Sequence, residues 1–137
     1  MAFPTTEEVN ERRVPFARLL GIEFQTVEPE RLVATMTVRP DMVTRPETLH
    51  GGAVMSFADT VGAVATVVNL PAGMVTTTME SKTNFVRAAP VGTEVTGTAE
   101  PVHKGRSTQV WTTRITLPDG RLVAQVTQTQ MVMPVKS

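Results

Sequence analysis

The spacing of apolar and polar residues changes several times along the chain, and each change predicts a different element. Residues 22–27 and 31–38 alternate between apolar and polar types, as half-buried strands do. In the second segment one face is apolar throughout, and it consists of Leu32, Ala34, Met36 and Val38. Further strands are predicted at about 74–87, 93–103, 107–117 and 121–133. Pro118-Asp119-Gly120 supplies the turn residues for a hairpin between the last two.

Two segments carry helical signals instead. Thr5-Thr6-Glu7-Glu8 combines a capping threonine, Thr5 or Thr6, with acidic residues in the first turn. A helix is expected over 6–18, and Pro15 should bend or end it. Apolar residues then recur at helical spacing within 51–68, namely Val54, Phe57, Ala58, Val61, Val64, Ala65 and Val68. The opposite side of this second helix is also apolar or small, so the helix is predicted to be buried almost all round.

The order of these elements is a helix, two strands, one long buried helix and four strands. Such an order predicts an α+β domain, residues 1–137, in which a curved, mostly antiparallel sheet wraps around one long central helix, the architecture of the hotdog fold. One sheet leaves part of that helix uncovered. A second copy is expected to cover it, so we expect at least a homodimer, and further a homotetramer.

Composition narrows the possible chemistry. Lys plus Arg and Asp plus Glu both total 13, which predicts no broad surface for nucleic acid or an anionic membrane. There is no Cys, and the two histidines show no metal-binding spacing, so no metal site and no redox cofactor are expected. The N-terminal segment has neither a signal-peptide nor an anchor pattern, and a cytoplasmic protein is expected.

Asp59 is the only charged residue between Gly51 and Met79, and it stands in the middle of the apolar helix. Desolvating an unpaired carboxylate is costly, so Asp59 is expected to be paired, protonated or exposed to a cavity. The structural alternative is a wet helix face, or a hydrogen bond to Thr60 or Thr66. The functional interpretation is a catalytic carboxylate.

His50-Gly51-Gly52 marks the start of the same helix. Two glycines there leave backbone N–H groups accessible at the positive end of the helix, where a ligand oxygen can bind, although an ordinary tight turn has the same sequence. Eight residues of helix separate Gly51 from Asp59 by about 12 Å. If both act on one carbonyl group, they must therefore come from different chains of an antiparallel dimer.

The segment from His50 to Asp59 resembles the H-G-G-x(6)-D/E signature of the hotdog thioesterases, in particular the phenylacetate-pathway (PaaI-type) and 4-hydroxybenzoyl-CoA thioesterase-like branch. The likeness runs from Leu20-Gly21-Ile22 to the end of the chain. It implies hydrolysis of acyl-CoA thioesters. In this family the residue matching Asp59 is a general base or a nucleophile, the N–H matching Gly51 polarises the thioester oxygen, and the histidine matching His50 is usually structural.

Thr44 departs from the family pattern, and Thr78 is only the nearest candidate for a family position. Many relatives carry Asn or Gln six residues before the histidine to orient substrate or water, and this sequence has Thr44 there. Relatives also use Ser or Thr in the strand after the helix to orient the attacking water, and Thr78 is the nearest candidate. The alternative for Thr78 is plain β-propensity within Thr76-Thr77-Thr78.

Coenzyme A carries several phosphates, and three cations at predicted strand ends could bind them: Arg87, Lys104 and Arg106. Ser107 and Thr108 could add hydroxyl donors. Solvated surface charge is the alternative for each cation. Trp111 is expected in the core or an interface. Five methionines suggest an adaptable apolar pocket for aryl or medium-chain acyl groups, and they are Met36, Met42, Met55, Met74 and Met79.

Two other functions stay open at this point. A hotdog hydratase or dehydratase would need a histidine near the carboxylate, and His103 is predicted on a different element. A non-enzymatic acyl-CoA-binding module is favoured by the missing amide at position 44 and disfavoured by Asp59.

Overall fold

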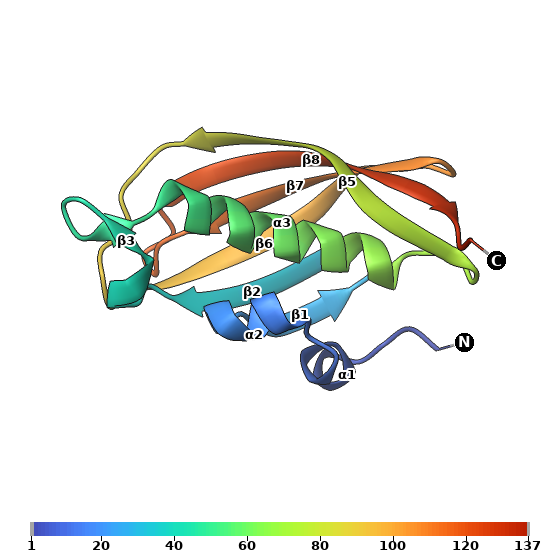
Figure 1. The fold of residues 1–137 in the computed structure, drawn as a ribbon, viewed down its shortest axis with the longest axis horizontal. Helices are drawn as coiled ribbons and strands as arrows, with labels where there is room; N and C mark the ends of the chain where they lie inside the picture. Colours follow the sequence, from blue (N-terminus) through green and yellow to red (C-terminus); the bar gives the residue numbers. More distant parts are fainter. Residues whose placement is uncertain (1, 137) are drawn as a thin grey trace.

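The computed structural model describes residues 2–136. Its elements follow the chain in the order drawn in Figure 1. They are α1 (Thr6–Glu11), α2 (Pro15–Leu20), β1 (Glu23–Glu28), β2 (Arg31–Thr37), the 3-10 turn η1 (Pro40–Met42), β3 (Val43–Thr44), β4 (Thr48–Leu49), α3 (Gly51–Val68), β5 (Met74–Phe85), β6 (Glu94–Lys104), β7 (Thr108–Thr116) and β8 (Leu122–Pro134).

Six strands form one antiparallel sheet in the order β1-β2-β6-β7-β8-β5, and α3 lies along one face of it (Figure 1). This arrangement confirms the α+β hotdog architecture. By length and composition, α3 is the one helix of the described chain that could cross a membrane. Its side toward the sheet is buried, as in the core helix of a globular protein.

The predicted long strands are confirmed, with ends that differ by one or two residues. The single helix predicted over 6–18 is wrong, because the chain forms two short helices there. Thr5 caps the first with a hydrogen bond from the Glu8 N–H, and Val14 then adopts an extended conformation. Pro15 begins the second helix, a position where its missing N–H costs nothing.

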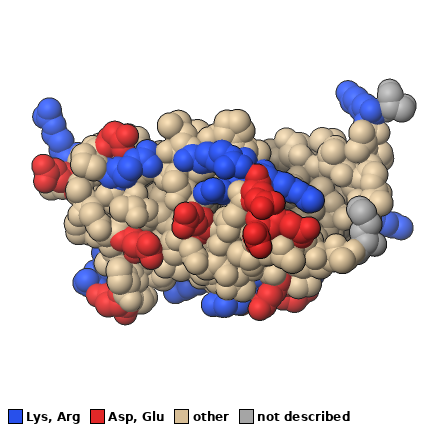
Figure 2. Space-filling model, turned by 90° about the horizontal axis from the view of Figure 1, so that it is seen from below, with Lys and Arg blue, Asp and Glu red and all other residues tan. Residues whose placement is uncertain are grey.

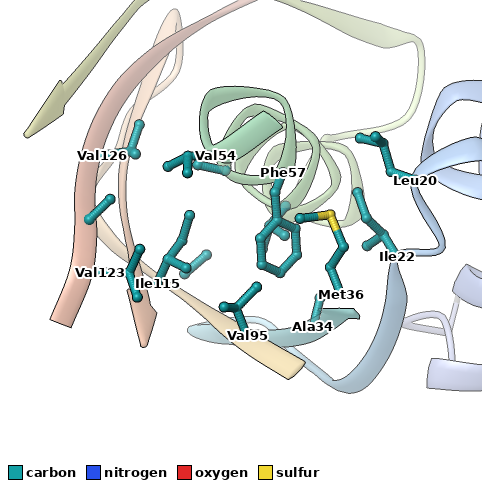
Figure 3. Packing of buried hydrophobic residues seen from close by; sticks show 14 of the residues in the cluster. Leu20, Ile22, Ala34, Met36, Val54, Phe57, Val95, Ile115, Val123 and Val126 are labelled. Carbon is teal, nitrogen blue, oxygen red and sulfur yellow. The ribbon is translucent and has the colours of Figure 1, made fainter. Parts of the chain in front are cut away.

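The core lies between α3 and the sheet. Figure 3 shows Phe57 pointing from α3 toward Val95 of β6 and Met36 of β2, and all three side chains are almost fully buried. Trp111 on β7 is fully buried as well, which confirms the expected core position for this residue. Of the five methionines, only Met36 and Met42 are buried, so they do not form one apolar pocket within the chain.

The side of α3 that faces away from the sheet is not fully covered by residues 2–136. Met55 and Val67 on this side are 40% and 54% exposed, although the sequence predicted burial almost all round. Beside α3 runs β5, an edge strand that pairs only with β8 and whose register shifts between Thr78 and Glu80. The uncovered side of α3 and the free edge of β5 are therefore neighbours.

On another face of the molecule, acidic side chains lie directly beside basic ones (Figure 2).

Candidate active site

Asp59 is half-buried, and its side chain accepts hydrogen bonds from two residues of the sheet. The Thr78 hydroxyl on β5 donates a 3.1 Å hydrogen bond to its Oδ1 atom. The amide nitrogen of Gln128 on β8 lies 3.3 Å from the same oxygen and 3.4 Å from the Asp59 carbonyl oxygen. The alternative partners Thr60 and Thr66 instead donate to helix carbonyl groups. Asp59 is therefore paired with neutral donors.

Thr78 is itself held by a buried glutamine. Gln130 on β8 donates a 2.7 Å hydrogen bond to the Thr78 hydroxyl oxygen, and the Thr76 hydroxyl lies 3.0 Å from the Gln130 carbonyl oxygen. Gln128 and Gln130 are both fully buried. Sequence reasoning missed them, although a signal was present: both occupy core-facing positions of β8, where the neighbouring core-facing residues Val126 and Val132 are apolar.

At the start of α3, the three residues of the His-Gly-Gly segment have different roles. His50 is the N-cap, and its Nδ1 atom accepts a 2.8 Å hydrogen bond from the Gly52 N–H. That bond occupies Gly52 and gives His50 a structural function. The Gly51 N–H, in contrast, has no acceptor within residues 2–136. It stands at the positive end of an 18-residue helix and is free to bind a ligand oxygen.

A pocket of about 390 Å³ opens at Gly51. Its lining is mostly apolar and includes Val54, Phe85 and Val123, with Arg87 also contributing. The Phe85 ring lies so close to Gly51 that a Cβ there would be 3.2 Å from it. A side chain at position 51 would therefore press against this ring, and glycine avoids that contact.

Asp59 does not line this pocket. Eight residues of continuous helix place it about 12 Å from Gly51, as the sequence predicted. Thr44 lies on β3, opposite Thr48, and is exposed. Thr78 thus lies against Asp59, and the pocket lies at Gly51. Thr44 forms no hydrogen bond to Asp59 or Gly51 within residues 2–136.

The candidate cations divide between the two ends of α3. Arg87 lines the pocket at the Gly51 end. Lys104 forms an ion pair with Glu30 and lies 3.5 Å from Asn69, the C-cap of α3. Arg106 and Ser107 occupy the turn after Lys104, and Thr108 begins β7. The 18 residues of α3 span about 27 Å, so Arg87 and Lys104 lie near opposite ends of a long helix.

Comparisons with known proteins identify the family of this chain. Residues 47–124 match the family model described as the thioesterase superfamily. The 1,4-dihydroxy-2-naphthoyl-CoA hydrolase of Escherichia coli is 34% identical over 103 residues, which are 75% of each chain. The acyl-coenzyme A thioesterase PaaI of the same organism is 31% identical over 108 residues, 79% of this chain and 75% of its own.

The fold is shared with solved thioesterases. The crystal structure of a thioesterase from Haemophilus influenzae superimposes with a TM-score of 0.92 at 27% identity, covering 99% of this chain and 95% of that one. The family model covers more than half of the present chain, including the whole of α3. This chain therefore belongs to the thioesterase superfamily, and it is a thioester hydrolase of the hotdog fold, similar to the PaaI-type enzymes.

Proposed function

We propose that the protein is an acyl-CoA thioesterase that hydrolyses an aryl- or medium-chain acyl-CoA to the free acid and coenzyme A. The observation that carries the proposal is the Gly51 N–H, which has no acceptor within residues 2–136 and belongs to a residue that lines an apolar pocket, together with a carboxylate, Asp59, on the same helix. The relatives named as hydrolases of acyl-CoA compounds support this substrate class.

In the proposed reaction the thioester oxygen accepts a hydrogen bond from the Gly51 N–H, which stabilises the negative charge that develops on that oxygen. Asp59 removes a proton from water as the water attacks the carbonyl carbon, or attacks that carbon itself. The carbon–sulfur bond then breaks and the sulfur leaves as the coenzyme A thiol after taking up a proton. If Asp59 is the nucleophile, water hydrolyses the resulting anhydride. Neither route uses a metal or another cofactor.

The site is proposed to form between two subunits. Met55 lies four residues from both Gly51 and Asp59, on the uncovered side of α3. A two-fold axis beside Met55 would place Gly51 of each protomer opposite Asp59 of its partner. The exposed Met55 side chains would then pack against one another.

The edge strand β5 supports the same axis. It contacts Asp59 through Thr78 and Gly51 through Phe85. The midpoint of β5 between these two contacts therefore lies beside Met55. A second copy related by this axis would pair its β5 with the free edge of the first, which removes an exposed strand edge. The proposed assembly is a homodimer at least, and two such dimers are proposed to form a homotetramer.

Such a dimer also groups the predicted phosphate ligands. Arg87 lies at the Gly51 end of one α3, whereas Arg106, Ser107 and Thr108 lie beyond the other end. In an antiparallel pair of helices, Arg106, Ser107 and Thr108 of one protomer would lie at one end of the interface. Asp59 of that protomer and the Gly51 pocket of its partner would lie toward the same end. We propose that the nucleotide of coenzyme A binds there, in a cytoplasmic enzyme.

The test is a panel of acyl-CoA esters assayed by release of free thiol. Hydrolysis of aryl- or medium-chain esters, with a preference over acetyl-CoA, is the expected result. Tight binding without thiol release would instead identify a binding module. A hydratase would change the acyl chain while the thioester persists, but His103, exposed at the end of β6, brings no imidazole to Asp59.

A further inference from the structure

Two buried glutamines on β8 direct their amide nitrogens toward Asp59, one through Thr78 and one directly. Gln130 is the register partner of Thr78, and both Gln128 and Gln130 are fully buried. A buried glutamine in a strand that faces the core is costly unless its amide is used. Here the Gln128 amide contacts the Asp59 carboxylate directly, and the Gln130 amide bonds to the Thr78 hydroxyl that donates to that carboxylate.

The direction of each hydrogen bond follows from chemistry. A carboxylate oxygen accepts hydrogen bonds, and the Thr78 hydroxyl donates to Asp59 Oδ1 across the 3.1 Å contact. That hydroxyl has a single hydrogen, and its oxygen must therefore accept from Gln130, whose Nε2 atom lies 2.7 Å away. If the Gln130 amide were reversed, its oxygen would compete with Asp59 for the Thr78 hydrogen. Gln130 thus fixes Thr78 as a donor to Asp59.

Gln128 is oriented by a second constraint. Its Nε2 atom lies 3.3 Å from Asp59 Oδ1. Its carbonyl oxygen is buried, has no hydrogen-bond partner among the described residues, and lies against Gly62 on α3. A Cβ at position 62 would be 2.2 Å from that oxygen. The glycine therefore leaves the space in which the Gln128 amide reaches the carboxylate.

Both hydrogen bonds end on Oδ1, and within residues 2–136 none ends on Oδ2. We propose that Gln130 and Gln128 are positioning residues that hold Oδ1 of Asp59 and thereby present Oδ2 to water or to the thioester carbon. This inference rests on the proposed catalytic role of Asp59. It adds how the carboxylate is oriented and which of its oxygens reacts.

A double-mutant cycle tests Gln130. Gln130→Met and Thr78→Val should each lower kcat by about 10- to 100-fold with little change in KM, because a carboxylate that is free to rotate is rarely aligned for attack. The double variant should lose no more than Thr78→Val alone, since Gln130 acts through Thr78. Thr78→Ser keeps the hydroxyl and should restore activity. Gln109→Met is the matched control, because Gln109 is the β7 register partner of Gln130 and bonds to Trp111 instead.

A second pair of variants tests Gln128 without removing its amide. Gly62→Ala should displace that amide and lower kcat about 10-fold, while the helix itself is favoured because Ala is a better helix former than Gly. In a Gln128→Ala background, which removes the clash, Gly62→Ala should have no further effect on kcat. A full additional loss there would overturn the role of Gln128. If the losses in kcat caused by Gln130→Met and Thr78→Val multiply in the double variant, the role of Gln130 is overturned.

The catalytic role of Asp59 and the positioning role of the two glutamines can be contradicted by different results. If Asp59→Asn keeps the wild-type kcat, the catalytic assignment fails. If Asp59→Asn is inactive while Gln130→Met and Gly62→Ala keep the wild-type kcat, only the positioning role fails. A readout without turnover uses the NMR signals of the Gln130 side-chain amide. Asp59→Asn should shift these signals in the wild-type background and not in Thr78→Val, and the absence of that difference would overturn the inference even for a chain that hydrolyses no ester in the panel.

Discussion

The Thr78 hydroxyl on the edge strand β5 donates to Oδ1 of Asp59 in the middle of α3, across 3.1 Å and 19 positions of sequence. This contact joins the uncovered strand edge to the one carboxylate of the apolar helix. Any group that pairs with the free edge of β5 therefore lies close to Asp59. The proposed dimer interface and the proposed reaction site share this contact.

Asp59→Asn should leave the fold and the assembly intact, because the amide is nearly isosteric with the carboxylate. It should lower thioester turnover by at least about 100-fold, the lower range for general-base catalysis. Binding of a non-hydrolysable acyl-CoA should change little. Thiol-release kinetics and calorimetry measure the two effects, and near-normal turnover would remove Asp59 from the mechanism.

Mixing two inactive variants tests whether the site is shared. Gly51→Pro removes the free N–H, and proline is tolerated at the first position of a helix. After subunit exchange with Asp59→Asn, half of the dimers are mixed, and each mixed dimer has one intact site. Activity should return to about a quarter of wild type.

This experiment requires that the Gly51 variant folds and forms dimers with wild-type chains, which circular dichroism and native mass spectrometry establish. Proven mixed dimers with no activity would mean that both groups act within one chain, or that Gly51 is outside the site.

Met55→Arg should break the dimer, because it would place two guanidinium groups against each other at the two-fold axis. Sedimentation should detect monomers, and turnover should fall with dimer content. Val102→Arg is the matched control, since Val102 is 66% exposed on β6, and two strands separate β6 from the edge strand β5. A Met55→Arg protein that remains an active dimer would contradict the proposed axis.

Replacing Lys104 and Arg106 by Gln should raise KM for CoA esters and weaken the salt dependence of KM. A short thioester without the nucleotide should be hydrolysed as before. Because Lys104 pairs with Glu30, Glu30→Gln is the control for loss of that ion pair alone. Equal losses with both substrates would assign these cations to the fold.

Asp119 gives the hairpin between β7 and β8 a pH-dependent contact. Hydrogen bonds from the backbone and side chain of Arg121 hold the pKa of Asp119 below its ordinary value of 3.8. A lowered folded-state pKa stabilises the protein above the ordinary value, and that stabilisation is lost as the pH falls through the folded-state pKa. Asp119→Asn should therefore lower Tm more at pH 7 than below pH 3.8. An equal Tm difference at both values would contradict this linkage.

The architecture was predictable because it depends on periodicity. Alternation along 31–38 predicts a strand and helical spacing within 51–68 predicts a helix, and both patterns depend on local sequence alone. The break at Pro15 was misjudged, because a proline that bends a helix and one that begins a new helix look alike in sequence. The difference is decided by the extended conformation of Val14.

The candidate site was predictable only in part. His50, Gly51 and Asp59 belong to one continuous segment, so their spacing could be interpreted directly. Gln128 lies 69 positions from Asp59, and only the strand order brings it there. Its polar side chain at a core-facing position was the available sign, but the identity of its partner depends on tertiary structure.

The register shift in β5 sets a length rule for this part of the chain. Thr78 and Phe85 are seven residues apart, and an odd separation places two residues on opposite faces of a regular strand. The extra residue between Thr78 and Glu80 returns both to the face that looks at α3. A one-residue insertion or deletion between positions 80 and 85 would turn Phe85 away from Gly51 while Thr78 still met Asp59. The number of residues between these two positions is therefore constrained separately from their identity, because it alone decides whether both side chains face α3.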